Sequence, residues 1–338
     1  MKGFSVRVQA VITWSQSLRN SPLTQLVKVL LSILVLAYVG RKLWEEKELW
    51  QISFATISLQ HAWWVGLAFL MAFPNLWLEA MKWRLMLRKA YPALRPMEAL
   101  QAVVAGISTG IFTPNRLGEY AGRLWLLQPG HRLAAGAYTM LGRFAQLAAT
   151  LLFGWIGLES LLYQYGPEWL LGVGLPIQGI PVIRMVAGAS VLLVWTTLLF
   201  PAKWSRILQW IPWDSAWFGR LQSALEAVHP KMMLKVLLLA CLRYAVFATQ
   251  YLLLLMAFEV EINPWVGLAL IQLTFWVQAG IPSITFTELG VRESVALLVM
   301  GQFGISTISA FGSTFLLYVF NMLVPSVLGI GILQRFRL

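Results

Sequence analysis

Long apolar runs separated by short polar segments extend along most of the chain. Two shorter runs, 97–113 and 264–281, end in segments that are rich in Gly, Pro and charge. A helix needs about 20 residues to cross the hydrocarbon core of a bilayer. Six runs come close to that length or exceed it: 23–40, 62–81, 133–157, 185–200, 231–258 and 306–333. The pattern predicts an all-α integral membrane protein with about six spanning helices, organised as a single domain over residues 1–338.

The two charged segments are FTPNRLGEYAGR at 112–123 and PSITFTELGVRE at 282–293. Each follows an apolar run and precedes another. In each, a Glu is followed four positions later by an Arg: Glu119 and Arg123, Glu288 and Arg292. A charged side chain at mid-membrane costs about 2.5–3.5 kcal/mol on insertion scales, so such residues usually mark a pathway or a site. These two segments therefore carry the functional hypothesis.

Proline and glycine residues predict a break in the helix within each charged segment. The residues expected to form these turns are Pro114, Gly118, Gly122, Pro282 and Gly290. Each short run would then enter and leave the membrane on the same side, as a re-entrant hairpin. Non-helical backbone at that depth is tolerated only where it lines a cavity or is buried in protein. The sequence therefore predicts two re-entrant hairpins beside a polar interior.

Basic residues cluster in 82–95, in 203–235 and in the tail, whereas 158–184 and 259–263 are mainly acidic. The excess of Lys and Arg in cytoplasmic loops places both termini in the cytoplasm and predicts a multi-pass protein of the cell (inner) membrane. Arg41, Lys42 and Lys47 are exceptions to this scheme, because they fall on the outer side. We interpret 23–40 as an uncleaved first span.

With this topology, the first hairpin enters from the cytoplasm and the second from outside. The order of long run, short run, charged turn and long run occurs twice, in the approximate halves 50–157 and 203–333. Two repeats of opposite orientation that meet mid-bilayer are typical of secondary transporters. We therefore expect an inverted repeat. The stretches 50–60 and 203–228 mix Trp, Leu and charge, and are expected to be amphipathic segments at the interface.

Composition excludes several classes of protein. Hydrophobic residues make up 59% of the chain and charged residues 12%, whereas soluble proteins carry roughly 25% charge. The net charge of +12 fits cytoplasmic loops facing anionic headgroups, and no nucleic-acid motif occurs. The single cysteine, Cys241, and three scattered histidines provide no disulfide framework or metal-ligand spacing, so no cofactor is expected. Asp214 is the only aspartate, and no hydrolase or P-loop motif supports an enzyme.

Arginine side chains and exposed helix N-termini in the turns favour a phosphate or another anion. Arg143 and Arg243 lie near the middle of spanning runs and should face the bundle interior. An i,i+4 Glu–Arg pair is also how a buried turn neutralises its own charge, so a purely structural clamp stays open. The predicted substrate-binding residues are Arg116, Glu119, Arg123, Glu288, Arg292, Glu293, Arg143 and Arg243.

The turns resemble a known family. The first has a "TPxRxGExxxR"-type pattern beginning at Thr113, and the second has an "IP…ELGxRE" pattern over 281–293. Together they resemble the lysylphosphatidylglycerol synthase transmembrane (flippase-like) family over roughly 23–333. This resemblance implies movement of a phospholipid between leaflets. The synthase part is absent, so lysyl transfer is not implied, and the second turn has Thr287 and Glu288 where the family usually has small residues.

The predicted function is binding and translocation of a phosphate-bearing lipid. Candidate substrates are a phospholipid, an aminoacyl-phospholipid and a polyprenyl-phosphate carrier. Membrane lipids with anionic headgroups are the expected partners, together with a second copy of the chain or a lipid-modifying enzyme, and nucleic acid is not. Two alternatives stay open. One is an anion channel or exchanger, because GIFTP at 110–114 and GIP at 280–282 are similar to chloride-channel loops. The other is a membrane transferase acting on a lipid carrier.

Overall fold

The computed structural model describes residues 22–45, 47–88, 91–111, 113, 116–125, 127, 132–172, 174–200, 203, 226, 228–281 and 288–335. These residues form helices and no strands. Within the described ranges, five helices are long and apolar enough to cross a membrane: Ala62–Leu87, Ala134–Tyr165, Ile177–Leu199, Pro230–Ala257 and Thr307–Arg335. The prediction of an all-α, multi-pass membrane protein is confirmed.

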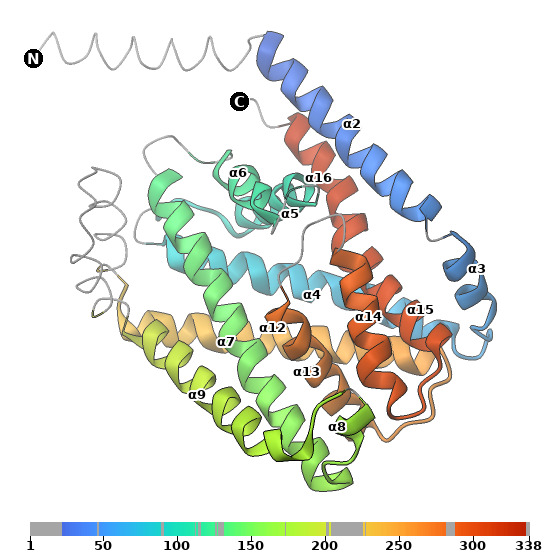
Figure 1. Ribbon diagram of the computed structural model, residues 1–338. Coiled ribbons are helices and arrows are strands. Elements are labelled where there is room, and N and C mark those ends of the chain that lie inside the picture. Colours follow the sequence, from blue (N-terminus) through green and yellow to red (C-terminus); the bar gives the residue numbers. More distant parts are fainter. Residues whose placement is uncertain are drawn as a thin grey trace, which may run out of the picture.

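The helices follow one another along the chain as shown in Figure 1. In order they are α2 (Pro22–Glu45), α3 (Lys47–Ala55), α4 (Ala62–Leu87), α5 (Pro96–Gly110), α6 (Gly118–Trp125), α7 (Arg132–Tyr165), α8 (Trp169–Gly172), η3 (Ile177–Gly179), α9 (Ile180–Leu199), α12 (Pro230–Ala257), α13 (Pro264–Gly280), α14 (Glu288–Gly301), α15 (Thr307–Tyr318), η5 (Val319–Leu323) and α16 (Val324–Arg335).

The predicted spans agree with most of these helices. The first run, 23–40, also forms a helix, α2, but this helix is not among the five spans above. The last run forms a single span from α15 to α16, and this span contains a π-helical turn at η5. Such π-turns within α-helices frequently occur at functional sites. The predicted amphipathic stretch 203–228 lies almost entirely outside the described residues.

The assignment of residues 82–95 to a cytoplasmic loop was wrong for the first residues of that range. Helix α4 continues to Leu87, and both Lys82 and Trp83 are buried inside the protein. Their polar atoms find partners there. The Lys82 ammonium lies 2.6 Å from Glu79 one turn earlier, and the Trp83 indole donates to the Thr139 hydroxyl of α7 across 2.9 Å. Burial is therefore compatible with their polarity, because each polar group is satisfied.

The long helices α4 and α12 pack along each other in the centre of the molecule (Figure 1). Helix α7 packs against both and is covered by α13 and α9. Helix α5 packs against α16, and α2 lies beside α16. The side-chain amide of Gln334 donates to the Ser32 hydroxyl across 3.0 Å. The start of α2 and the end of α16 consequently lie on the same side of the molecule (Figure 1).

Two pairs of short helices, α5 with α6 and α13 with α14, pack against each other at the predicted hairpins. At 1.5 Å per residue, the 15 residues of α5 extend about 22 Å, which is shorter than the hydrocarbon core of about 30 Å. Glycines bring α5 and α6 into close contact. A Cβ at Gly118 would lie 1.9 Å from the Thr109 carbonyl oxygen, and one at Gly122 would lie 2.2 Å from the Thr109 hydroxyl. Only glycine fits at these two positions.

Candidate functional site

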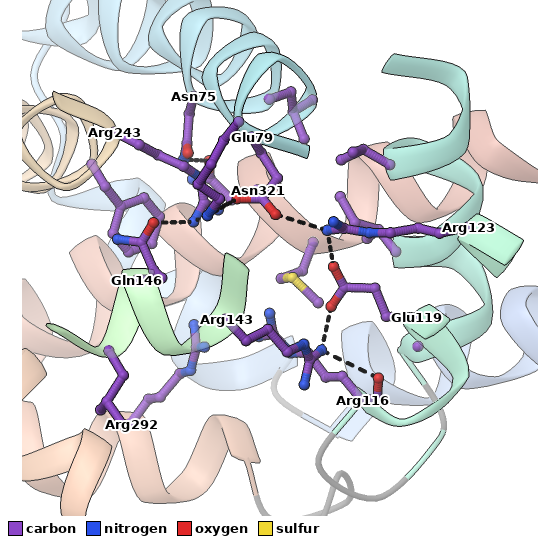
Figure 2. A pocket seen from close by; sticks show the side chains of 18 residues that line it. Asn75, Glu79, Arg116, Glu119, Arg123, Arg143, Gln146, Arg243, Arg292 and Asn321 are labelled. Atoms are coloured by element: carbon purple, nitrogen blue, oxygen red, sulfur yellow. Dashed lines mark hydrogen bonds and ion pairs between the residues drawn. The ribbon is translucent and has the colours of Figure 1, made fainter. Parts of the chain in front are cut away.

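A cavity of about 380 Å³ lies between the long helices and the two hairpins (Figure 2). Its volume is in the range of small-molecule sites. Among the described residues, eight charged side chains line it: Glu79, Lys82, Arg116, Glu119, Arg123, Arg143, Arg243 and Arg292. Asn75, Gln146 and Asn321 also contribute polar groups. Six of the eight predicted substrate-binding residues therefore meet in one place.

Glu119 of α6 connects the first hairpin to α7. Its carboxylate accepts a hydrogen bond from Arg123, one turn further along the same helix, and another from Arg143 of α7. The Glu119 and Arg123 side chains are buried, and Arg143 is about two-thirds buried. The i,i+4 partnership predicted for Glu119 and Arg123 is thus present, and Arg143 adds a second cation from another helix.

Glu79 of α4 is the second buried carboxylate. It accepts a hydrogen bond from Arg123 across 2.9 Å, and it lies 2.6 Å from the Lys82 ammonium and 3.5 Å from the Arg243 guanidinium of α12. Arg123 therefore bridges the two carboxylates (Figure 2). A charged network joins α4, α6, α7 and α12 around the cavity. Buried charges of this kind depend on their partners, because an isolated buried charge is strongly destabilising.

Arg116 forms the turn between α5 and α6 and has a left-handed backbone, with φ of 54°. This region is uncommon for residues other than glycine and costs free energy unless the surroundings hold it. Three contacts fix the turn. The Arg116 amide donates to the Thr113 carbonyl, the Thr113 hydroxyl accepts from the Gly118 amide, and Arg143 donates to the Arg116 carbonyl. The turn thus presents Arg116 to the cavity at the expense of local strain.

The second hairpin contributes Arg292 of α14. Figure 2 shows its side chain approaching the cavity from another side than Glu119 and Arg123. The side-chain amide of Gln278, on α13, donates to the Arg292 carbonyl across 3.1 Å and so ties the two helices together. Glu293 is buried but does not line this cavity. The two hairpins therefore each contribute an arginine to the same space.

The remaining predicted residues have other positions. Gly290 lies inside α14, where a Cβ would meet no atom within 4 Å. Glu288 begins α14, but its side chain lies outside the described part of the structure, as do Pro114 and Pro282. The predicted pairing of Glu288 with Arg292 therefore stays a prediction.

A buried amide network continues from the cavity toward the core. Asn75 of α4 donates to the side-chain oxygen of Asn321 across 2.7 Å, and Asn321 donates to Gln250 of α12 across 2.9 Å. Asn321 lies in the π-helical turn η5. The three side chains thus connect the π-turn to α4 and α12 beside the cavity.

A second cavity of about 270 Å³ shares Arg116, Arg243 and Arg292 with the first. The rest of its wall is mixed: Gln146, Thr150 and Gln278 contribute polar groups, and aromatic or aliphatic groups come from Tyr244, Phe247, Phe275, Ala279 and Val291. Tyr244 stacks on Phe153 with ring centroids 4.7 Å apart, and Phe247 stacks on Phe275 at 5.1 Å. The cationic centre therefore adjoins a space whose wall carries aromatic rings beside polar side chains.

Comparison with protein families supports the resemblance seen in the two turns. The model of the lysylphosphatidylglycerol synthase TM region matches residues 25–329 of the chain. The chain belongs to this family. Comparison with curated proteins finds no match. Membership in the lysylphosphatidylglycerol synthase TM family, together with the spanning helices, indicates a lipid-related multi-pass membrane protein. The matched segment contains every residue that lines both cavities.

Sequence reasoning missed the central role of two residues in this lysylphosphatidylglycerol synthase TM region. Glu79 was not among the predicted site residues, and Lys82 was assigned to a loop. The signal that identifies them is their i,i+3 spacing at the end of an apolar run, which places both on one helix face. Among the described residues, no cluster of three or more His, Cys, Asp or Glu side chains could hold a metal ion.

Proposed function

We propose that this protein binds a phosphate-bearing lipid in the cavity between the two hairpins and moves it between the leaflets. The observation that carries the proposal is that Arg116 and Arg292, one from each hairpin, line a single cavity among the spanning helices. Guanidinium groups bind phosphate through paired, charge-assisted hydrogen bonds. Charged residues at membrane depth normally line a pathway or a water-filled cavity.

The second cavity supports an amphiphilic ligand. It adjoins the arginines, and its wall carries the aromatic rings of Tyr244, Phe247 and Phe275 beside polar side chains. A phosphate held by the arginines would leave these rings for the first part of an acyl or prenyl chain. A hydrated halide makes no use of these aromatic rings, whereas a hydrocarbon chain can pack against them, and on this ground the rings favour a lipid.

The order of helices and their contacts support an inverted repeat. The series α4, α5, α6, α7 corresponds to α12, α13, α14 and the span α15–α16, and the contacts occur in matching pairs. Helix α13 packs against α7 as α5 packs against α16, and α12 packs against α15 as α4 packs against α7. In transporters, such repeats place the site at the bilayer midplane and alternate access by rocking one repeat against the other. With the basic loops inside, both termini are cytoplasmic.

Transfer of lipid between leaflets tests this function directly. The purified protein is reconstituted into vesicles that contain a trace of a fluorescent phospholipid or polyprenyl phosphate, and outer-leaflet probe is quenched chemically. We expect the protein to make the inner-leaflet probe accessible, and empty vesicles to retain it. Halide flux without lipid movement would instead identify an anion pathway. Loss of a modified lipid in a deletion strain, with unchanged leaflet distribution, would identify a transferase.

A further inference from the structure

The charges that line the first cavity do not cancel. Among the described lining residues, six side chains are cationic and two are carboxylates, which leaves an excess of four positive charges. The cations are Lys82, Arg116, Arg123, Arg143, Arg243 and Arg292. Even if Glu288 and Glu293 of the second turn are counted as further lining charges, an excess of two remains. The sign of the excess therefore does not depend on those two residues.

Part of this positive charge is deeply buried. The Lys82 side chain is 1% exposed and that of Arg123 is 3% exposed. Cations buried to this degree are stabilised only if anions accompany them. The carboxylates of Glu79 and Glu119 already form ion pairs with Lys82, Arg123, Arg143 and Arg243. The lining as a whole keeps a net positive charge, which attracts an anionic ligand.

Two donor atoms point to the same conclusion. The Nε atoms of Arg123 and Arg243 are buried and have no hydrogen-bond partner among the described residues. Buried donors are nearly always satisfied, by protein, water or ligand. Arg243 lines both cavities, so it lies where the two spaces meet.

We propose that the headgroup bound in this cavity is a lipid monophosphate or diphosphate, which carries about two or more negative charges at pH 7. The proposal rests on the lipid function proposed above and narrows its substrate class. A phosphodiester such as phosphatidylglycerol brings only one negative charge, so at least one positive charge of the excess stays uncompensated. An aminoacyl-phospholipid also brings ammonium groups, and these would face the cationic side chains.

The arrangement of the cations fits a phosphate with several free oxygens. Arg143, Arg243 and Arg292 come from three different helices and lie on different sides of the cavity (Figure 2). A terminal phosphate has three oxygens that can be contacted from different directions, whereas a phosphodiester has two and is flanked by ester groups. The site thus distinguishes the two by geometry as well as by charge.

Binding measurements on the full-length protein in phosphatidylcholine nanodiscs test this inference. The probes are farnesyl monophosphate, farnesyl diphosphate, phosphatidylglycerol, lysyl-phosphatidylglycerol and inorganic pyrophosphate. We expect the two prenyl phosphates to bind at least about tenfold more tightly than phosphatidylglycerol, and lysyl-phosphatidylglycerol to bind most weakly of the lipids. The affinity for farnesyl diphosphate should also fall more steeply with salt than that for phosphatidylglycerol.

A pair of variants locates the effect. Arg292→Ala should remove most of the preference for the prenyl phosphates, and Arg184→Ala, which changes an exposed arginine of α9 paired with Glu159, should leave it intact. The salt dependence of the unmodified protein keeps the inference testable if Arg292→Ala fails to fold.

Each contrary result overturns a different statement. Equal affinity for phosphatidylglycerol and farnesyl diphosphate would overturn the narrowed substrate class and leave the lipid function standing. Equal affinity for inorganic pyrophosphate and farnesyl diphosphate would assign the site to a soluble anion and overturn the lipid itself. Absence of binding by every lipid would overturn both proposals.

Discussion

Arg143 donates a hydrogen bond from its guanidinium to the backbone carbonyl of Arg116, across 3.2 Å. The same Arg143 nitrogen also contacts the Glu119 carboxylate. One side chain on a spanning helix therefore holds both the strained turn and the acid that follows it. The position of Arg116 in the cavity depends on α7 as much as on its own hairpin.

The first prediction concerns this contact. Arg143→Lys keeps the charge, but it replaces a planar fork by a shorter point charge that cannot hold the Arg116 carbonyl and Glu119 in the same geometry. Hydrogen bonds that involve a charged group contribute about 1.5–3 kcal/mol, so we expect lipid transfer in vesicles to fall about tenfold or more. Arg184→Lys on the exposed face of α9 is the matched control and should keep the full rate. Full transfer by Arg143→Lys would show that the contact does not position the turn.

The second prediction concerns Glu79, which neutralises cations from three helices. Glu79→Gln leaves Lys82 and Arg123 buried with less compensation. Breaking a buried ion pair by removing one partner typically costs about 3–5 kcal/mol. We therefore expect a clear drop in the melting temperature of the detergent-solubilised protein. Glu48→Gln, on the exposed surface of α3, is the control and should melt like the unmodified chain. An unchanged melting temperature for Glu79→Gln contradicts the stabilising role of the network.

The third prediction separates two glycines of the charged turns. Gly118→Ala places a Cβ 1.9 Å from the Thr109 carbonyl oxygen, so α6 must move away from α5. Gly290→Ala meets nothing within 4 Å in α14 and replaces a poor helix former by a good one. We expect Gly118→Ala to lower the yield of folded protein in size-exclusion chromatography, and Gly290→Ala to be neutral or slightly stabilising. Equal behaviour of the two variants argues against tight packing of the first hairpin.

Much of the cavity lining could be predicted from the sequence, because a charged residue within a spanning run normally faces the bundle interior or a water-filled cavity. This reasoning identified Arg116, Arg123, Arg143, Arg243 and Arg292, which all line the cavity. It failed for Lys82, since a basic residue at the end of an apolar run is equally typical of a cytoplasmic loop. Only the fold shows that α4 continues and that Glu79 satisfies the Lys82 ammonium.

Other features depend on contacts that are distant in sequence. The pairing of Glu119 with Arg123 follows from helical spacing, but its contact with Arg143 requires α7 to pack beside α6. The left-handed backbone of Arg116 has no sequence signal either, because glycine or asparagine is the usual residue in that conformation. The amide network of Asn75, Asn321 and Gln250 likewise joins three helices that no local pattern relates.

The central claim is that Arg116 binds the phosphate of the transported lipid, and Arg116→Gly tests it most directly. Glycine adopts a φ of 54° without strain, so the turn should fold at least as well while the guanidinium is lost. The measurement is the rate at which a fluorescent polyprenyl phosphate crosses between leaflets of vesicles that contain the variant. We predict an unchanged melting temperature and a transfer rate close to that of empty vesicles. A variant that folds normally and transfers the lipid at the unmodified rate would contradict the account.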